Sequence, residues 1–288
     1  MNIALDCGLQ LFTFVKQGKG TDITKVTGAI DTDEVWLVSK KYDGFYTQIH
    51  WNHITRECVV FTSSGKEAIV PSLTRLLQSM YFKHSFIIEA EYIYNCEGKL
   101  GDRVNSGRLM SYVSNTAKGI TNPLDKNDTF KAFDCLMYDG KDLRYEPFRE
   151  RVSRIPMGLA IDFTLYDLAG AKEQIDEWTA DGWEGGMLRH KESIVKPRGR
   201  NKQLLKIKSY HLATGICLNT LPGEGKYEGM VGALVIQLTY QGLDYMVTVG
   251  SGLTDEMRAA NPNSFLGKFY SVKFYGSIDK LIHPVLVW

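Results

Sequence analysis

Several features that commonly reveal a protein's class are missing from this sequence of 288 residues. Its five cysteines are scattered and form no Cys-x-x-Cys pair. That spacing excludes a four-cysteine zinc module and gives no sign of a disulfide framework, so a reducing cytosol is expected. The first residues lack a basic stretch followed by an apolar core, and no apolar run approaches the length that crosses a bilayer. Neither a secretory leader nor a membrane anchor is therefore expected.

An excess of one charge is also missing. The 34 Lys and Arg residues balance the 33 Asp and Glu residues, which leaves a formal net charge of +1. A chain of this balance is not an overtly basic nucleic-acid binder, so any surface for nucleic acid must arise from local clusters of basic residues. Length and the 44% content of hydrophobic residues suffice for the cores of one large or two modest domains.

The informative part of the sequence is an ordered series of short strings. The first, Lys41-Tyr42-Asp43-Gly44, follows the apolar, strand-like run Val35-Trp36-Leu37-Val38. A lysine at such a strand end can act as a nucleophile once burial or neighbouring cations free its amine of a proton. Taken alone, the string is equally typical of a strand end followed by an Asp-Gly turn.

Further strings follow downstream: Glu89-Ala90-Glu91, Phe133-Asp134, Glu184-Gly185-Gly186-Met187 and Leu205-Lys206-Ile207-Lys208. A two-residue spacing on a strand points both side chains to one face, so the two glutamates share a face, as do the two lysines. Each string by itself is more often an ordinary solvated strand face. The order of the whole series is what indicates a shared chemical site.

In this order the strings resemble the motifs of the covalent nucleotidyltransferase superfamily, and within it the ATP-dependent DNA ligases, in a phage-like form with two domains. They correspond to motifs I, III, IIIa, IV and V of that family, beginning with Lys41-Tyr42-Asp43-Gly44. The glycine-rich stretch 223–234 and the stretch 249–255 resemble the oligonucleotide-binding (OB) domain of ligases. Those two stretches favour a DNA ligase over capping enzymes and RNA ligases. The resemblance covers the chain from about Val35 onward.

The pattern of expected elements agrees with two domains. Residues 1–209 alternate strand-like and helical stretches, with helices predicted at 70–80 and 171–180. From residue 210 the pattern changes to strands separated by glycines, predicted at 213–220, 231–239, 244–249 and 268–276. We therefore expect an α+β fold. The resemblance implies a nucleotidyltransferase (adenylation) domain, with antiparallel sheets and flanking helices, over 1–209, and a small β-barrel of the OB-fold over 210–288.

The resemblance implies a mechanism that uses ATP and Mg²⁺. Lys41 would attack the α-phosphate of ATP, and the resulting lysyl-AMP would pass its AMP to the 5′-phosphate of a nick. The 3′-hydroxyl would then displace the AMP and seal the strand. Carried over by position, the expected ATP-binding residues are Ser39, Lys40, Lys41, Asp43, Glu91, Phe133, Glu184, Lys206 and Lys208.

The implied roles of these residues differ. Ser39 and the backbone carbonyl of Lys40 would contact the edge of the adenine, and Phe133 would stack on its face. The motif V lysines would hold the α-phosphate and stabilise the charge that develops there. Glu184 is the best candidate metal ligand, and Glu91 is expected to bind the ribose or the metal, because Mg²⁺ prefers hard oxygen ligands beside a triphosphate.

Two polar segments are candidates for contact with nicked double-stranded DNA. Residues 98–121 resemble a segment between motifs III and IIIa of phage ligases, and a second basic cluster precedes motif V. The expected DNA-binding residues are Arg103, Asn105, Arg108, Lys118, Arg198 and Arg200, which can reach phosphates and sugars. A mobile polar loop and unpaired surface charge are the ordinary alternatives. A monomer in a bacterial or phage-infected cytosol is expected, with a role in DNA repair, replication or recombination.

Departures from the family pattern keep alternatives open. Tyr46 and Ser64 stand where arginines are usual, and no string matches the C-terminal motif VI, for which Lys273 and Lys280 are candidate substitutes. ATP is expected rather than NAD because only forty residues precede Lys41 and the zinc module of NAD-dependent relatives is missing. The alternatives are an RNA ligase or other covalent nucleotidyltransferase, and a weakened, non-catalytic nucleic-acid-binding relative.

Overall fold

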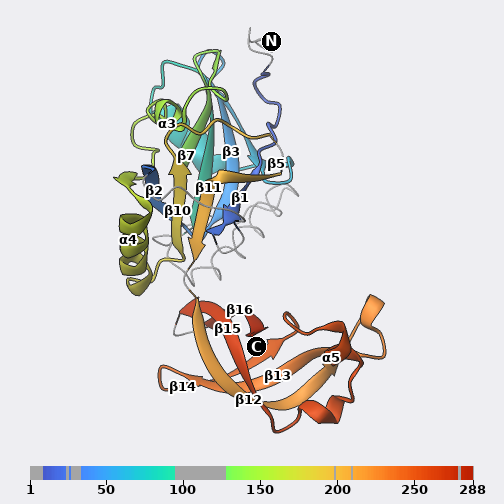
Figure 1. Cartoon of the computed structure of the whole chain (residues 1–288). Coiled ribbons are helices and arrows are strands. Elements are labelled where there is room, and N and C mark those ends of the chain that lie inside the picture. Colours follow the sequence, from blue (N-terminus) through green and yellow to red (C-terminus); the bar gives the residue numbers. More distant parts are fainter. Residues whose placement is uncertain are drawn as a thin grey trace. The chain divides into compact units, whose positions relative to one another are not determined.

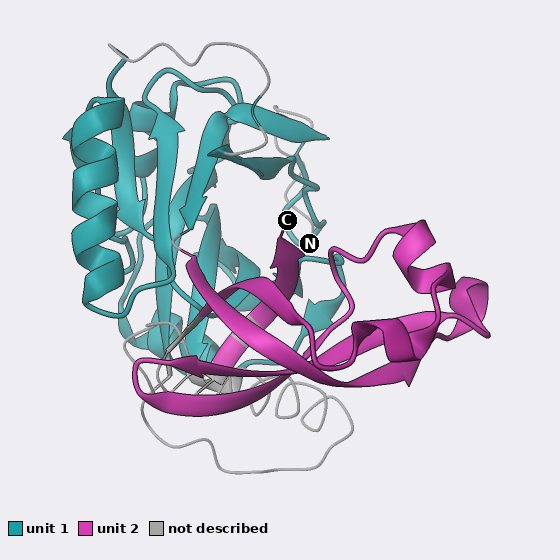
Figure 2. Cartoon of the chain, turned by 60° about the horizontal axis from the view of Figure 1, so that its bottom comes forward, with its two compact units in different colours: residues 1–208 teal, residues 209–288 magenta. Residues whose placement is uncertain are grey.

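The computed structural model describes residues 9–23, 26, 34–94, 128–197, 199–208, 210–277 and 280–287. The chain divides into two compact units, residues 1–208 and residues 209–288 (Figures 1 and 2). The boundary expected from the sequence lies next to this division, after residue 209. Among the described residues, no helix is long and apolar enough to cross a membrane.

The first unit contains a six-stranded antiparallel sheet in the order β5-β4-β3-β6-β7-β8. Its strands are β3 (Phe45–Asn52), β4 (Glu57–Thr62), β5 (Glu67–Ala68), β6 (Phe86–Tyr94), β7 (Asp128–Tyr138) and β8 (Lys141–Asp142). Hydrophobic side chains of β3 and β6, such as Ile49, Trp51 and Ile88, are fully buried in the largest core of the unit. The opposite face of these strands carries the polar residues Gln48, Glu89 and Glu91.

The second sheet of this unit has five strands in the order β1-β11-β10-β2-β9. They are β1 (Lys19–Asp22), β2 (Trp36–Lys40), β9 (Thr164–Tyr166), β10 (Gly185–His190) and β11 (Arg200–Lys208). All of their pairings are antiparallel except that of β1 with β11, which is parallel. The expectation of antiparallel sheets therefore holds for this sheet except at one edge, where β1 joins β11.

Three helices of the first unit are described: α1 (Pro71–Ser79), α3 (Phe148–Val152) and α4 (Leu168–Ala180). The predicted helices at 70–80 and 171–180 are confirmed as α1 and α4. Helix α4 begins earlier than predicted because the Asp167 side chain accepts a hydrogen bond of 2.7 Å from the backbone N–H of Gly170 and caps the helix. Its apolar face, which includes Ile175, packs against β10 and β2.

The second unit is a single sheet in the order β14-β13-β12-β15-β16. Its elements are β12 (His211–Pro222), β13 (Val231–Tyr240), β14 (Leu243–Val249), β15 (Phe269–Ser277), β16 (Lys280–Val287), helix α5 (Asp255–Ala259) and the 3-10 turns η2 (Gly225–Tyr227) and η3 (Pro262–Phe265). The four predicted strands are confirmed as β12–β15. A bridge between Ser251 and Val285, with a 3.0 Å hydrogen bond from the N–H of Leu286 to Ser251 O, curls the sheet toward a barrel.

Helix α1 offers a test of how this core is stabilised. Leu73 is 0% exposed and lies in the main core, whereas Leu76 on the same helix is 40% exposed. Leu73→Ala should lower the free energy of unfolding by roughly 2–5 kcal/mol, because it leaves a cavity in a packed interior. Leu76→Ala, the matched control, should cost less than about 1 kcal/mol. Urea unfolding of both variants checks the difference, and equal losses would contradict the assigned packing of α1.

Candidate active site

Three strands of the five-stranded sheet bring the candidate nucleophile and its charged neighbours together. Lys41 directly follows β2, Glu184 directly precedes β10, and Lys208 ends β11. In the sheet, Gly185 pairs with Lys208 and Gly186 pairs with Lys40. The last residues of β2 and β11 therefore lie on either side of the first residues of β10. The backbone N–H of Lys41 also donates to the carbonyl of Gly185 at 2.9 Å. The predicted motif I, IV and V residues therefore share one site.

The Glu184 carboxylate lies between two of these lysines. Lys41 Nζ donates to Oε2, and Lys208 Nζ donates to Oε1. Burial by itself would raise the pKa of Glu184, but Lys41 and Lys208 together hold this pKa below its ordinary value. The carboxylate is consequently ionised, and it offsets part of the repulsion between the two ammonium groups.

Lys206 and Glu91 complete the charged site from its two sides. Lys206 lies on β11 two residues before Lys208, and burial together with the cations Lys41 and Lys208 lowers its pKa. Glu91 comes from β6 in the other sheet. Burial raises the pKa of Glu91 to about 7, against the opposing attraction of Lys41, and the N–H of Gly44 donates a hydrogen bond to it. The site thus lies where the two sheets of the first unit meet.

Two glycines of the motifs permit this close approach. Gly185 has a φ of +141°, and a Cβ there would lie 2.1 Å from the carbonyl oxygen of Ile207. A Cβ on Gly44 would lie 2.5 Å from the carbonyl oxygen of Tyr92 and 2.9 Å from Cγ of Glu91. A side chain at either position would force the strands apart, so the glycines of motifs I and IV serve the geometry of the site.

The remaining predicted ATP-binding residues lie on β2, directly after it, and on β7. Ser39 is buried on β2 and pairs with Met187 of β10. Asp43 lies in the turn between β2 and β3, two residues after Lys41. Phe133 is half-buried at an irregular position of β7, with its ring centroid 6.3 Å from that of Tyr46. The Lys40 side chain turns away from Glu184 and lies 4.4 Å from the ring centroid of Trp183.

The predicted DNA-binding residues are distributed differently. Arg200 is exposed at the start of β11, where its carbonyl oxygen accepts a 3.1 Å hydrogen bond from Lys196 Nζ. The other five, Arg103, Asn105, Arg108, Lys118 and Arg198, lie outside the described residues. The structure therefore does not test them.

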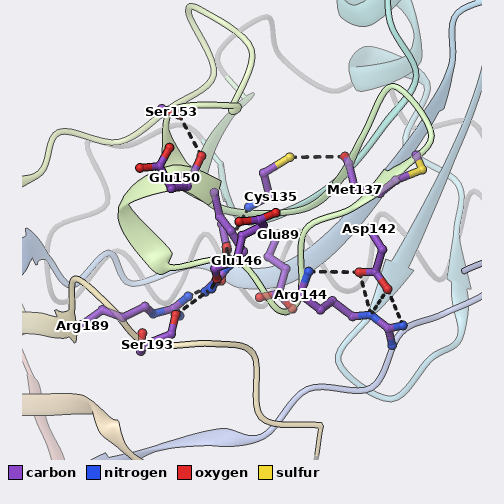
Figure 3. A network of polar contacts seen from close by, with 12 residues as sticks. Glu89, Cys135, Met137, Asp142, Arg144, Glu146, Glu150, Ser153, Arg189 and Ser193 are labelled. Carbon is purple, nitrogen blue, oxygen red and sulfur yellow. Dashed lines mark hydrogen bonds and ion pairs between the residues drawn. The ribbon is translucent and has the colours of Figure 1, made fainter. Parts of the chain in front are cut away.

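A second network of buried charges escaped the sequence analysis. Arg151 of α3 donates to both carboxylate oxygens of Asp134, at 2.8 and 3.0 Å, and Arg189 of β10 forms an ion pair with the same carboxylate. The Nη1 atom of Arg151 donates further bonds of 2.7 Å to the carbonyls of Glu146 and Ser193. Figure 3 shows Glu146, Arg189 and Ser193 gathered in this network. No local signal pointed to Arg151, because its partner lies 17 residues earlier in the chain.

Tyr46 belongs to the same region and explains one departure from the family pattern. It stands where an arginine was expected, and its hydroxyl donates to the carboxyl of Glu89. Burial raises the pKa of Tyr46 well above its ordinary value, so the phenol stays neutral. Gln48 in turn donates to the Tyr46 oxygen at 3.3 Å and to the carbonyl of Val15 at 2.9 Å. An uncharged hydrogen-bond chain replaces the expected cation at this position.

The neighbouring carboxyl groups of Glu89 and Asp134 take different protonation states. Both are buried and face each other across β6 and β7. Burial and the charge of Asp134 raise the pKa of Glu89 to about 7. Asp134 is also opposed by burial, but the guanidinium groups of Arg151 and Arg189 hold its pKa below the ordinary value. Asp134 therefore carries the charge, and Glu89 keeps its proton up to about neutral pH.

Comparisons with known families and proteins agree with this geometry. The family model described as "ATP dependent DNA ligase domain" matches residues 20–208, and the model "DNA ligase OB-like domain" matches residues 222–280. A DNA ligase of Natronomonas pharaonis is 25% identical over 283 residues, which covers 89% of this chain and 50% of that protein. A DNA ligase of Halorubrum lacusprofundi is 33% identical over 133 residues, covering 43% of this chain and 22% of its own. The chain thus spans at most half the length of these two relatives.

Solved structures show a similar fold. A structure titled "DNA binding with a minimal scaffold: Structure-function analysis of Lig E DNA ligases" matches with a TM-score of 0.66 and 21% identity, covering 95% of this chain and 98% of that one. A structure titled "Pmar-Lig_PreS3" matches with a TM-score of 0.69 and 16% identity, covering 96% and 67% respectively. The two-unit arrangement of sheets found here is therefore a known fold.

The raised pKa of Glu89 has a measurable consequence for stability. The folded protein keeps the Glu89 proton up to about pH 7, while the unfolded chain loses it near the ordinary value of 4.5. Between these values the folded state binds more protons, so this group lowers the free energy of unfolding as pH rises, by up to about 3 kcal/mol. Glu89→Gln keeps an acceptor for Tyr46 and removes the titration. Its free energy of unfolding should fall less than that of the original protein between pH 5 and 8.

Urea unfolding at a series of pH values measures this difference. Glu67→Gln, an exposed position on β5, is the matched control and should follow the original protein. Parallel pH profiles for the Glu89→Gln variant and the original protein would show that Glu89 does not hold a proton in the folded state.

Proposed function

The chain belongs to the ATP-dependent DNA ligase family, and we propose that it seals nicks in double-stranded DNA through a lysyl-AMP intermediate. The observation that carries this proposal is the Glu184 carboxylate, which holds Lys41 and Lys208 together at the end of β2. A nucleophilic lysine among cations is the arrangement that an attack on a phosphate requires. The match of residues 222–280 to the ligase OB-like domain favours DNA over RNA as the substrate.

The first step follows from the contacts of Lys41. The Lys41 ammonium first gives one proton to solvent. The neutral amine nitrogen then forms a bond to the α-phosphorus of ATP while the bond from that phosphorus to pyrophosphate breaks, and the nitrogen releases a second proton to solvent. Lys206 and Lys208 lie on one face of β11, where they can bind the α-phosphate and the negative charge that grows on it. Lys41 must leave Glu184 to react, and Lys208 remains to neutralise that carboxylate.

Glu91 and Glu184 are the residues that fit a Mg²⁺ ion. They approach the site from different sheets, and each supplies hard carboxylate oxygen. Within the described part of the chain, no three side chains of metal-binding type gather into one group. The pair of carboxylates agrees with Mg²⁺, which is commonly held by one or two carboxylates together with substrate phosphates and water. Bound there, the ion would neutralise charge on the triphosphate.

The adenine and DNA contacts are also part of the proposal. Ser39 and the carbonyl of Lys40 would read the adenine edge, and Phe133 would stack on the base. Asp43 would shape the turn after the nucleophile. The basic residues Arg103, Arg108, Lys118, Arg198 and Arg200 and the polar residue Asn105 would bind the DNA backbone.

The setting of the reaction is proposed as well. All of the candidate catalytic residues belong to one chain, which supports action as a monomer. The described cysteines, Cys58, Cys135 and Cys217, are free thiols, which agrees with a reducing cytosol of a bacterium or a phage-infected host.

Mass spectrometry after incubation with ATP and Mg²⁺ tests the proposed first step. The protein should gain the mass of one AMP, and peptide mapping should place it on Lys41. Lys41→Ala should form no adenylate and seal no nick from ATP, because the nucleophile is missing. Lys66→Ala, which removes an exposed lysine before β5, is the control and should behave like the original protein. Adenylate formation that persists in Lys41→Ala would contradict the assignment of the nucleophile.

A further inference from the structure

The side chains of the adjacent residues Lys40 and Lys41 point in different directions and have different partners. Lys41 contacts the Glu184 carboxylate. Lys40 lies on the side of β2 that α4 covers, with its Nζ 4.4 Å from the ring centroid of Trp183 and 6.0 Å from that of Trp178. A lysine ammonium over an indole is attracted by the negative electrostatic potential of the ring face. Both lysines carry the same reactive group, so their placement decides which of them meets a nucleotide.

Trp183 contacts the residues on both sides of the nucleophile. Its indole lies against Lys40, and the ring of Tyr42 meets it edge to face, with centroids 5.2 Å apart and an interplanar angle of 81°. The indole is itself well fixed, because Trp183 is 6% exposed and its backbone N–H donates to the carbonyl of Trp178 at 2.9 Å. Its Nε1 donates to Asp181 at 3.3 Å.

The same short segment also holds the backbone and side chain of the nucleophile. Trp183 precedes Glu184, which pairs with the Lys41 ammonium, and Gly185 follows, whose carbonyl accepts the Lys41 N–H at 2.9 Å. Three consecutive residues before and at the start of β10 therefore contact three consecutive residues at the end of β2. Trp183 is the member of this set whose described ring contacts are with the two neighbours of Lys41.

We propose that Trp183 is a positioning residue for the adenylylation reaction, which holds the amine of Lys41 toward the nucleotide and the amine of Lys40 away from it. The inference rests on the proposed function. By packing on Lys40 and Tyr42, the indole fixes the backbone on both sides of Lys41 and limits where its amine can lie. Without this packing the amine is less often in line with the α-phosphorus. Small displacements of a reacting group lower a reaction rate by large factors.

Substitution of Trp183 by leucine tests the inference. With saturating ATP, Trp183→Leu should form the adenylate about 10–100-fold more slowly, because the amine is less often in line. The apparent KM for ATP should change by less than about threefold, since no contact to the nucleotide is removed. Trp183→Phe keeps an aromatic face and should recover most of the rate. Tyr145→Leu, which changes an aromatic side chain that is 73% exposed after β8, is the matched control and should stay within about threefold of the original protein.

The site of modification gives an independent readout. In Trp183→Leu a fraction of the AMP should appear on Lys40. Its ammonium loses one proton to water, the nitrogen bonds to the α-phosphorus as pyrophosphate leaves, and a second proton passes to water. Without nucleotide, an amine-reactive ester should label Lys40 several-fold faster in Trp183→Leu than in the original protein, as peptide mass spectrometry can measure. This labelling does not need ligase activity. A protein that takes no AMP from ATP but shows the labelling change would refute the proposed function and support the packing role.

Several results would overturn the proposal. One is a folded Trp183→Leu variant with the original adenylylation rate and unchanged labelling of Lys40. Another is a slower reaction that arises only from a raised KM, because this would place Trp183 in nucleotide binding. If Trp183→Leu fails to fold, Tyr42→Leu removes the second ring contact instead. That variant should react about threefold to tenfold more slowly, and an unchanged rate would count against the proposal.

Discussion

Each of the two oxygens of the Glu184 carboxylate forms an ion pair with a lysine, and the arrangement of the candidate catalytic lysines depends on that double contact. Strands β2 and β11 do not pair with each other, since β10 lies between them. The Glu184 carboxylate, directly before β10, therefore links β2 and β11 across the strand with which both of them pair. It also leaves the site with an excess of positive charge, because Lys206 adds a third ammonium while the pKa of Glu91 is raised to about 7. Such a site suits a polyanionic substrate.

Behind this charged site, the Asp134 network ties α3, β7 and β10 together. Arg151 and Asp134 are each about 1% exposed, and an ion pair so deeply buried is stable only when every partner is in place. Removal of either arginine would leave the buried carboxylate with one guanidinium partner in place of two. The protonated Glu89 beside it keeps a second charge out of the same space. Electrostatic balance thus helps to hold the six-stranded sheet, through β7, to the five-stranded sheet, through β10.

Local patterns in the sequence predicted much of this fold. Helices α1 and α4 and the strands β12–β15 follow from residue periodicity and glycine positions, and the order of the motifs predicted that Lys41, Glu184 and Lys208 share a site. Sequence could not predict the partners of Arg151, which depend on how distant strands pack. Tyr46 was read as a missing cation, whereas the structure shows its phenol bonded to Glu89. The parallel pairing of β1 with β11 was also missed, because nothing within residues 19–22 identifies a partner at residues 200–206.

That parallel pairing constrains how the chain can fold as it is synthesised. Strand β1 leaves the ribosome early, but its neighbour β11 is almost the last part of the first unit to emerge. The Thr21 hydroxyl, for example, donates to the carbonyl of Asn201, 180 residues away. Contacts between such distant segments form slowly, because a long loop must close before any bond is gained. During translation, β1 must therefore stay without its partner strand until β11 has been synthesised. The second unit begins to emerge directly after β11.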